Sequence, residues 1–466
     1  MVEKKCIEGK WWLPGQESTA ASGTLIFDPQ SGPTLAVKQR QSRSFDEILL
    51  AMAENKEPPA HLVIFGCDDS KNPITLHRCV CYRQSDAAEI EGCSFTVQSA
   101  FLGAYLANPD ETQFGSLQIE IDYLYVWLGQ SANRTVSKLN EDFVYTEITA
   151  LPKPIEVDLG PHGTMQLLTS DGTGFSWNMN ERLETTSWKS RIWWQLRESV
   201  PLSVLDDYVH ALCRLFTLLV SKPVRLRSYS LMRNCLGEPQ TYEGKPDTGV
   251  EVLRARYSDP ESLPQVWGAQ FAVLFEEVRN DLALCISRWF DYHARFKTVL
   301  NLYFAEFFSR SQHSETRFVL LTQALEVYHR IRFPGGEQSE DKWQSKFSEI
   351  VKSAPVEHQE WLIKKLKWSN EKRLRKRLEE LVKIHAETLQ PIIRKPVAFA
   401  GLVTETRNHF THWGSSESSI ISDDDLPAYT DRARRLLQIC ILSDLGIANT
   451  AVQRIVAEPL PKVIAF

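Results

Sequence analysis

The sequence predicts an α+β protein in which a β-rich N-terminal part, sandwich-like in its pattern, precedes an all-helical C-terminal bundle. Up to about residue 190, short apolar runs alternate with Gly, Pro, Asn and Asp, as strands and turns do. From about residue 269, apolar residues recur at helical spacing. We therefore expect a β-rich domain at 1–190, a mixed α/β extension or junction at 191–268, and a helical domain at 269–466.

The size and charge of the chain limit the classes of protein to consider. Its 466 residues are many for a single hydrophobic core and predict two or three domains. The hydrophobic content of 43% and the charged content of 24% are ordinary for a globular protein. Because the formal net charge is −6, the whole chain has no electrostatic reason to bind nucleic acid, and an RNA site would have to be a local basic surface.

The sequence also indicates where the protein works. The N-terminus lacks the apolar core of a signal peptide, and no stretch reaches the roughly 20 apolar residues that span a bilayer. Nine scattered Cys residues, an odd number, suit free thiols in a reducing compartment. P-loop, GxGxxG and GxSxG patterns are absent. We therefore expect a cytoplasmic protein without a membrane contact or a cofactor.

Several short strands account for the β-rich part, and their spacing is typical of a sandwich or a barrel-like domain. The last of them alternates apolar and polar residues, as a strand with one solvated face does. In the mixed segment we expect one helix, beginning beside Pro201, and two strands. The expected strands are Gly23–Phe27, His61–Phe65, Ile74–Tyr82, Leu117–Tyr123, Val224–Leu231 and Val250–Tyr257, and the helix is Leu202–Val220.

The C-terminal part reads as helices separated by short loops. Its strongest breaker is the Pro-Gly-Gly sequence in the loop at 333–338. The expected helices are Phe271–Phe308, with or without a break, Glu315–Ile331, Lys342–Ser353, Val356–Leu366, Asn370–Leu389, Pro396–Trp413 and Leu426–Leu445.

The helix at 396–413 carries the residues most suited to chemistry. One face is an apolar stripe of Phe399, Leu402, Val403, Thr406, Phe410 and Trp413. The remaining faces carry Glu405, Arg407, Asn408, His409, Thr411 and His412. A solvated helix face usually holds Lys and Glu, which are strong helix formers, so helix propensity does not explain this polar set.

Arg407 and His412 could together cleave RNA without a metal. Histidine titrates near neutral pH and can exchange a proton with the 2′-hydroxyl or the leaving oxygen. Arginine stays charged, and its planar fork matches phosphate oxygens. Asn408 lies four residues before His412 and could orient the imidazole or the phosphate. Alternatively, Arg407 is a capping residue or bridges to a neighbouring acid, and His412 packs on the surface.

Helix geometry separates these two residues. Positions five apart lie about 140° apart around the axis and about 7.5 Å along it. Either the long arginine side chain curls round the helix, or a second copy of the chain completes the site.

Five stretches of the sequence together carry a resemblance to a known family. They are Arg407-Asn408 followed by His412, the upstream helix Leu320–Arg330, the opening Gly9–Gly15 (GKWWLPG), the strand from Gly23 and the segment Tyr125–Trp127. These stretches resemble the ApeA-type HEPN proteins of bacterial anti-phage defence. The resemblance implies a metal-independent endoribonuclease that leaves a 2′,3′-cyclic phosphate and a 5′-hydroxyl. It implies a site completed across a homodimer or higher homo-oligomer. It further implies RNA as the target, with tRNA as a candidate, and abortive infection as the outcome. The N-terminal domain would sense a phage-derived trigger or restrain the nuclease.

Two further residues are supporting candidates for this site. The family pattern places a polar residue of the upstream helix near the motif, and Glu326 fits that position. The other interpretation of Glu326 is an ordinary pair with Arg330, four residues on. His409 could be a second active histidine, or it could pack at the border of the apolar stripe.

A basic run is the candidate RNA surface. Residues 364–383 hold nine Lys or Arg and three Glu, a net of +6, with Trp361 and Trp368 nearby as stacking platforms. The alternative is a solvated helix face with salt bridges. The candidate RNA-binding residues are Lys364, Lys365, Lys367, Lys372, Arg373, Arg375, Lys376 and Arg377.

A zinc site is a minor alternative in the β-rich part. Cys67, His77, Cys79, Cys81 and Cys93 could supply ligands, but no CxxC pair is present, and structural zinc sites usually have one. Buried small hydrophobic side chains are the other interpretation. For the whole protein, the alternatives to a ribonuclease are a non-catalytic HEPN protein that binds RNA or nucleotides, and an interaction protein whose β domain senses a ligand.

Overall fold

The computed structural model describes most of the chain as two compact units. One unit contains residues 1–271 and 282–287, and the other contains 272–281 and 288–466. The described residues are 4–38, 45, 62–82, 92–129, 133–138, 144–150, 152–178, 181–232, 249–255, 270–308, 313–412, 420–447 and 449–458.

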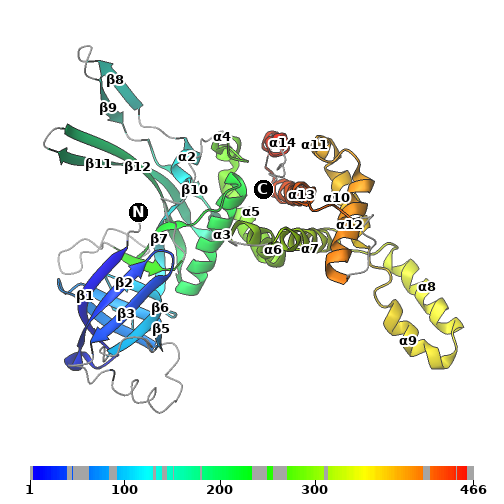
Figure 1. The fold of residues 1–466 in the computed structure, drawn as a ribbon, viewed down its shortest axis with the longest axis horizontal. Helices are drawn as coiled ribbons and strands as arrows, with labels where there is room; N and C mark the ends of the chain where they lie inside the picture. Colours follow the sequence, from blue (N-terminus) through cyan, green and yellow to red (C-terminus); the bar gives the residue numbers. More distant parts are fainter. Residues whose placement is uncertain are drawn as a thin grey trace. The chain divides into compact units, whose positions relative to one another are not determined.

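A single large antiparallel sheet dominates the first unit, and Figure 1 shows its curved strands. A separate two-stranded sheet pairs β8 (Asn133–Lys138) with β9 (Val144–Ala150). The strands of the large sheet are β1 (Lys5–Trp12), β2 (Ala21–Asp28), β3 (Gly32–Lys38), β4 (Leu62–Asp68), β5 (Pro73–Tyr82), β6 (Gly92–Leu102), β7 (Gln113–Ile121), β10 (Ile155–Asp158), β11 (Thr164–Asn178), β12 (Glu181–Pro201), β13 (Leu226–Met232) and β14 (Val250–Arg254).

Six of these strands close into a barrel. The pairs run from β1 to β2, β3, β6, β5 and β4, and β4 returns to β1. Strand β6 is long enough to pair with β3 through its first half and with β14 through its second half. From β14 the sheet continues outward through β13, β7, β12, β11 and β10. The β-rich N-terminal part is therefore confirmed, and of its two expected forms the structure has the barrel, because β5 and β6 pair.

The core of the barrel includes one of the tryptophans of the opening GKWW sequence. Trp11 is fully buried, and its indole N–H donates to the carbonyl oxygen of Gly23 at 3.0 Å. A Cβ atom added at Gly66 would lie 2.1 Å from the Trp11 ring. Only glycine therefore lets β4 pass this close to the indole.

Residues after 190 continue the same unit. Helix α3 (Leu202–Val220) has the bounds that the sequence predicts, and it packs on β7 and β12. Two aromatic contacts connect α3 to its neighbours. The ring centroids of Phe216 and Trp127, which lies on the short helix α2 (Leu124–Leu128), are 5.2 Å apart, and those of Tyr208 and Trp194 of β12 are also 5.2 Å apart. The mixed segment thus adds the second half of β12, together with α3, β13 and β14, to the first unit.

Helices make up the second unit, as the sequence predicts. Helix α7 lies at its centre and packs against α6, α10, α12 and α13. The stretch expected at 370–389 is two helices, and α14 was not expected. The helices of this region are α4 (Phe275–Val278), α5 (Leu282–Arg295), α6 (Lys297–Phe308), α7 (Ser314–Arg332), α8 (Glu340–Ser353), α9 (Val356–Leu366), α10 (Leu374–Ile384), α11 (Ala386–Leu389), α12 (Pro396–His412), α13 (Leu426–Asp444) and α14 (Asn449–Ala457).

Helices α8 and α9 form an arm that projects from these helices (Figure 1), and neither contains a fully buried residue. Its two stems are joined at the base by Asn370, whose side chain accepts from the Gln338 N–H at 3.0 Å and donates to the Gln338 carbonyl at 3.1 Å. The Asn370 carbonyl also accepts from the Glu337 N–H at 2.8 Å. Among the described residues, no helix is both long and apolar enough to cross a membrane.

Candidate functional site

Three helices of the second unit, α7, α10 and α12, pack against one another and carry the candidate residues. Phe318 of α7 meets Phe410 of α12 edge to face, with ring centroids 6.2 Å apart. On the buried side of α12, the Thr406 hydroxyl accepts from the Ile421 N–H at 2.9 Å. The apolar stripe predicted for α12 therefore faces inward, with Val403 and Thr406 fully buried.

Arg407 lies on the polar side of α12 and has two partners. Its Nη2 donates to Oε2 of Glu326 at 2.9 Å, and its Nη1 donates to Oδ1 of Asn408 at 3.2 Å. The Arg407 and Glu326 side chains are 24% and 19% exposed. A pair this sheltered is screened less by water than a surface pair, so the guanidinium has a defined position.

Glu326 connects Arg407 to a ladder of alternating charges. Its other oxygen, Oε1, accepts from Nη2 of Arg330 at 3.4 Å. The same Arg330 nitrogen lies 3.0 Å from Oε2 of Glu371, which follows the turn at the base of the α8–α9 arm. The sequence offered two interpretations of Glu326, and in the structure the carboxylate has both contacts at once.

A buried histidine lies beside this ladder. His329, fully buried on α7, contacts Oε2 of Glu380 through Nε2 at 2.8 Å and Nη1 of Arg377 through Nδ1 at 3.2 Å. Because arginine can only donate, Nδ1 accepts, and the imidazole is neutral with its proton on Nε2. Burial lowers the pKa of His329, and the nearby Arg377 lowers it further, against the opposing effect of Glu380.

Burial alone would raise the pKa of Glu380, but hydrogen bonds from Lys372, at 2.7 Å, and from His329 hold that pKa below its usual value. Sequence reasoning missed this cluster of His329, Arg377, Glu380 and Lys372. A signal was available, since His329 follows Leu325 by four residues in the apolar stripe of its helix.

His412 ends the described part of α12, and its side chain, like all of Trp413, lies outside the described residues. The helix is continuous from Arg407 to His412, so the two positions are separated by about 140° around the helix axis, as the sequence predicts. His409 is half-buried beside Phe410, with ring centroids 5.8 Å apart.

The basic run divides into exposed and buried parts. Lys364, Lys365, Lys367, Arg373, Arg375 and Lys376 are exposed, whereas Lys372 is half-buried in its pair with Glu380. Arg377 is a correction: it is only 2% exposed, and its Nε donates to the Lys372 carbonyl at 2.8 Å. It follows Leu374 by three residues in the apolar stripe of α10, so it faces the interior and cannot contact RNA from the surface.

The zinc candidates do not assemble into a ligand set in the described region. Within the part of the chain that the structure describes, no group of three or more His, Cys, Asp or Glu could hold a metal ion. His77 instead lies 3.1 Å from Oδ2 of Asp110, and Cys79 and Cys81 are buried. The side chain of Cys93 lies outside the described residues.

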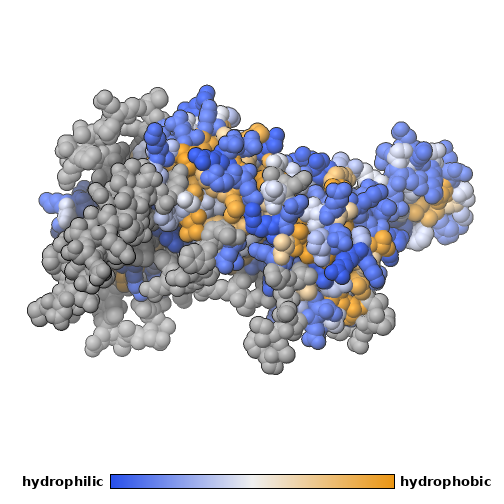
Figure 2. Space-filling model, turned by 90° about the horizontal axis from the view of Figure 1, so that it is seen from above, coloured by the Kyte–Doolittle hydropathy of each residue, from blue (hydrophilic) through white to orange (hydrophobic). Residues whose placement is uncertain are grey.

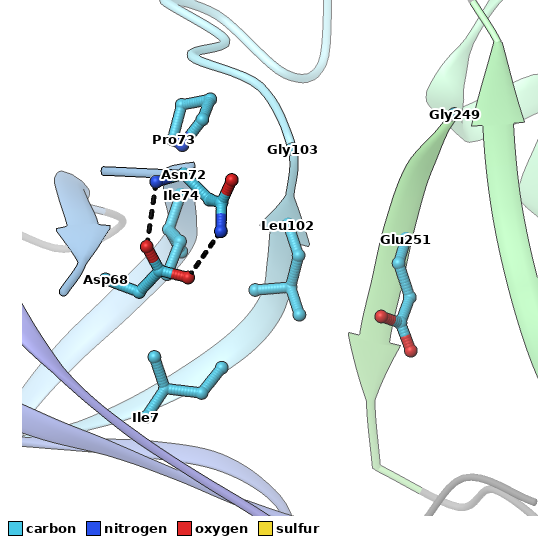
Figure 3. A pocket seen from close by; sticks show the side chains of 9 residues that line it. All are labelled: Ile7, Asp68, Asn72, Pro73, Ile74, Leu102, Gly103, Gly249 and Glu251. Atoms are coloured by element: carbon cyan, nitrogen blue, oxygen red, sulfur yellow. Dashed lines mark hydrogen bonds between the residues drawn. The ribbon is translucent and has the colours of Figure 1, made fainter. Parts of the chain in front are cut away.

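The first unit contains a pocket of about 340 Å³ lined by residues of β1, β4, β5, β6 and β14. Figure 3 shows Leu102 between Asp68 and Glu251 in this view. Both carboxylates have partners within the chain: Asp68 accepts from the backbone and side-chain nitrogens of Asn72 at 2.8 and 2.7 Å, and Glu251 pairs with Lys5 at 2.6 Å.

Two family models match the chain. The model described as ApeA N-terminal domain 1 matches residues 6–289, which is more than half of the 466 residues, and the model described as Apea-like HEPN matches residues 319–451. The second match contains Glu326, Arg407, Asn408 and His412. No curated protein and no solved structure matches the chain.

Proposed function

Because the chain belongs to the ApeA family, we propose that it is an endoribonuclease of anti-phage defence. It joins an ApeA N-terminal domain to an ApeA-like HEPN domain, which makes it a HEPN-type defence protein. It cleaves RNA, with tRNA as a candidate target, by attack of the 2′-hydroxyl on the adjacent phosphate. The products are a 2′,3′-cyclic phosphate and a 5′-hydroxyl. The proposed place of action is the cytoplasm, where the RNA is.

One observation carries this proposal: Arg407 is held in position on the polar side of α12 by Glu326 and Asn408. Arg407 stabilises the negative charge that grows on the phosphate in the transition state, because a fixed cation needs no reorganisation during the reaction. His412 transfers the proton, as a group that titrates near neutral pH can. Asn408 positions the phosphate or the imidazole.

A second copy of the chain completes the proposed site. On a continuous helix, positions 407 and 412 lie about 140° apart around the axis, so one protomer places these two residues on different sides. Two α12 helices related by a two-fold axis would bring the Arg407 of one copy toward the His412 of the other. The N-terminal unit would sense a phage-derived trigger and release the nuclease.

The test compares cells that express the wild type, His412→Ala or the control His313→Ala, with and without phage challenge. His313 precedes α7 and is exposed, so its loss removes a histidine without touching the motif. Total RNA from each strain, treated with EDTA on collection, is run on a gel, and the fragment ends are analysed.

We expect fragments with cyclic phosphate ends from the wild type and the control, and intact RNA from His412→Ala. Equal cleavage by His412→Ala would exclude its catalytic role. Intact RNA in every strain under phage challenge, with defence retained in His412→Ala, would favour a non-catalytic HEPN protein that binds RNA or a ligand.

A further inference from the structure

The α8–α9 arm exposes two tryptophans over more than half of their surface. Trp361 is 59% exposed and Trp368 is 64% exposed. Helix α9 ends at Leu366, and Trp368 lies two residues beyond this end. Lys367, between them, has helical backbone angles, so Trp368 continues the path of the helix. Residues seven apart lie almost on the same side of a helix, about 10.5 Å apart along its axis. Exposed tryptophan is costly in water, so two on one side indicate a partner.

The chain from Lys364 onward is cationic, and Lys364 itself pairs with Glu360 at 2.7 Å. Residues 364–376 contain seven Lys or Arg and one Glu, a net of +6 in a chain whose net charge is −6. The ammonium of Lys367 lies 4.9 Å from the Trp368 ring centroid, and Lys364 and Lys365 lie between the two indoles in sequence. Figure 2 shows hydrophobic surface beside strongly hydrophilic surface on the arm, the lobe at the right of that view.

The base of the arm adjoins the candidate site. Asn370 joins its two stems, and the next residue, Glu371, lies 3.0 Å from Arg330. Arg330 in turn contacts Glu326, the partner of Arg407. A ligand on the outer side of α9 would therefore be bound by an element whose base contacts the residues around Arg407.

We propose that the outer side of α9, formed by Trp361, Trp368 and the lysines between them, binds unpaired nucleotides of an RNA. This inference rests on the proposed function and names its substrate class, which is RNA with a single-stranded region. Indole rings stack on the faces of unpaired bases, and lysines follow the backbone phosphates. A duplex keeps its bases stacked inside and offers the tryptophans no face. The rise of about 10.5 Å along the helix axis between these two residues corresponds to about three steps of a stacked nucleic-acid strand.

Binding is measured on the full chain carrying His412→Ala, so that the probe stays intact. The probes are a short fluorescent single-stranded RNA without internal pairing, and the same RNA annealed to its complement. The variants add Trp361→Ala with Trp368→Ala, or Trp361→Tyr with Trp368→Tyr, which keeps a stacking ring. The control is Ile363→Ala, an apolar residue 45% exposed that points away from both indoles.

We expect the double alanine variant to weaken single-stranded binding by about tenfold or more and to change duplex binding by less than about twofold. The double tyrosine variant and the Ile363→Ala control should stay within about threefold of the parent. Equal losses on both probes, or no loss on the single strand, would overturn the proposal. A smaller oligomer in the double alanine variant would overturn it too, since the indoles would then bind a second copy of the chain. Because binding is read without cleavage, failure of the ribonuclease proposal would leave this result unaffected.

Discussion

Nη2 of Arg407 lies 2.9 Å from Oε2 of Glu326, although 81 residues separate the two in sequence. Glu326 also accepts from Arg330, so one carboxylate is shared by two guanidinium groups. A carboxylate that pairs with two guanidinium groups restricts both side chains more than a single exposed ion pair would. The conformational freedom of the carboxylate is lost once for two ion pairs. Glu326 therefore acts through Arg407 as a positioning residue in the proposed reaction.

Replacing Glu326 should reduce RNA cleavage without unfolding the protein. Glu326→Ala removes the contact that fixes the guanidinium, and we expect a cleavage rate about 10 to 100 times lower, since small displacements of a catalytic group have effects of this size. Glu326→Gln retains a hydrogen-bond acceptor and should lose less. The rate of RNA fragmentation in phage-challenged cells measures this. Gln323→Ala, exposed one turn earlier on α7, is the control, and an equal loss in that variant would refute a specific role for Glu326.

Arg407→Lys should be nearly as inactive as Arg407→Ala. The arginine uses separate nitrogens for Glu326 and Asn408, and a lysine ammonium is a single point that cannot reproduce this fork. We expect cleavage to fall by about 100-fold, measured as fragment yield over time. Arg394→Lys, exposed just before α12, should cleave at the parent rate. Substantial activity in Arg407→Lys would mean that charge alone is sufficient.

Arg377→Met should destabilise the helical unit. The substitution leaves two acceptors, Nδ1 of His329 and the carbonyl of Lys372, without their donor. Each such group costs about 1–3 kcal/mol, so we expect the free energy of unfolding to fall by at least about 2 kcal/mol. Urea unfolding followed by the helical circular-dichroism signal measures it. Arg375→Met, exposed on the same helix, should change that free energy by less than about 0.5 kcal/mol. A stable Arg377→Met variant with weakened RNA binding would contradict the buried role.

Mild acid should destabilise the helical unit through His329. Its pKa is lowered in the folded protein, chiefly by burial, so below the ordinary value of 6.5 the unfolded chain binds a proton that the folded chain does not. Its contribution to stability is complete above pH 6.5 and is lost as the pH falls from there toward the folded-state pKa. The slope is about 1.4 kcal/mol per pH unit for one such group.

His385 of the same unit has a pKa lowered by burial as well, so it adds to the slope in the same direction. The contribution of His329 is therefore obtained by comparing the pH dependence of stability in the parent with that in a variant that lacks this histidine. Urea unfolding at pH 7.5 and pH 5.5 should show a smaller loss of stability in His329→Gln than in the parent. Identical losses in the two proteins would show that His329 does not titrate in this range.

Local patterns predicted the elements well. Helices α3 and α9 have the predicted bounds. Both signals that predict them, apolar periodicity and a proline beside the first turn, come from residues within or next to the helix itself. Helix α10 shows where this reasoning failed. Arg377 was assigned to the surface from the charge of its neighbours, although its spacing from Leu374 and Leu378 already placed it in the apolar stripe.

The β-rich and helical parts, the polar face of α12 and the cationic run beside two tryptophans could all be predicted from the sequence, since each depends on residues that are close together in the chain. Three contacts became known from the folded structure: β5 and β6 close a barrel, Glu326 pairs with Arg407, and a neutral His329 lies between Arg377 and Glu380. These contacts join segments far apart in the chain. They depend on how strands pair and how helices pack against each other. The periodicity of a single segment does not determine either of these.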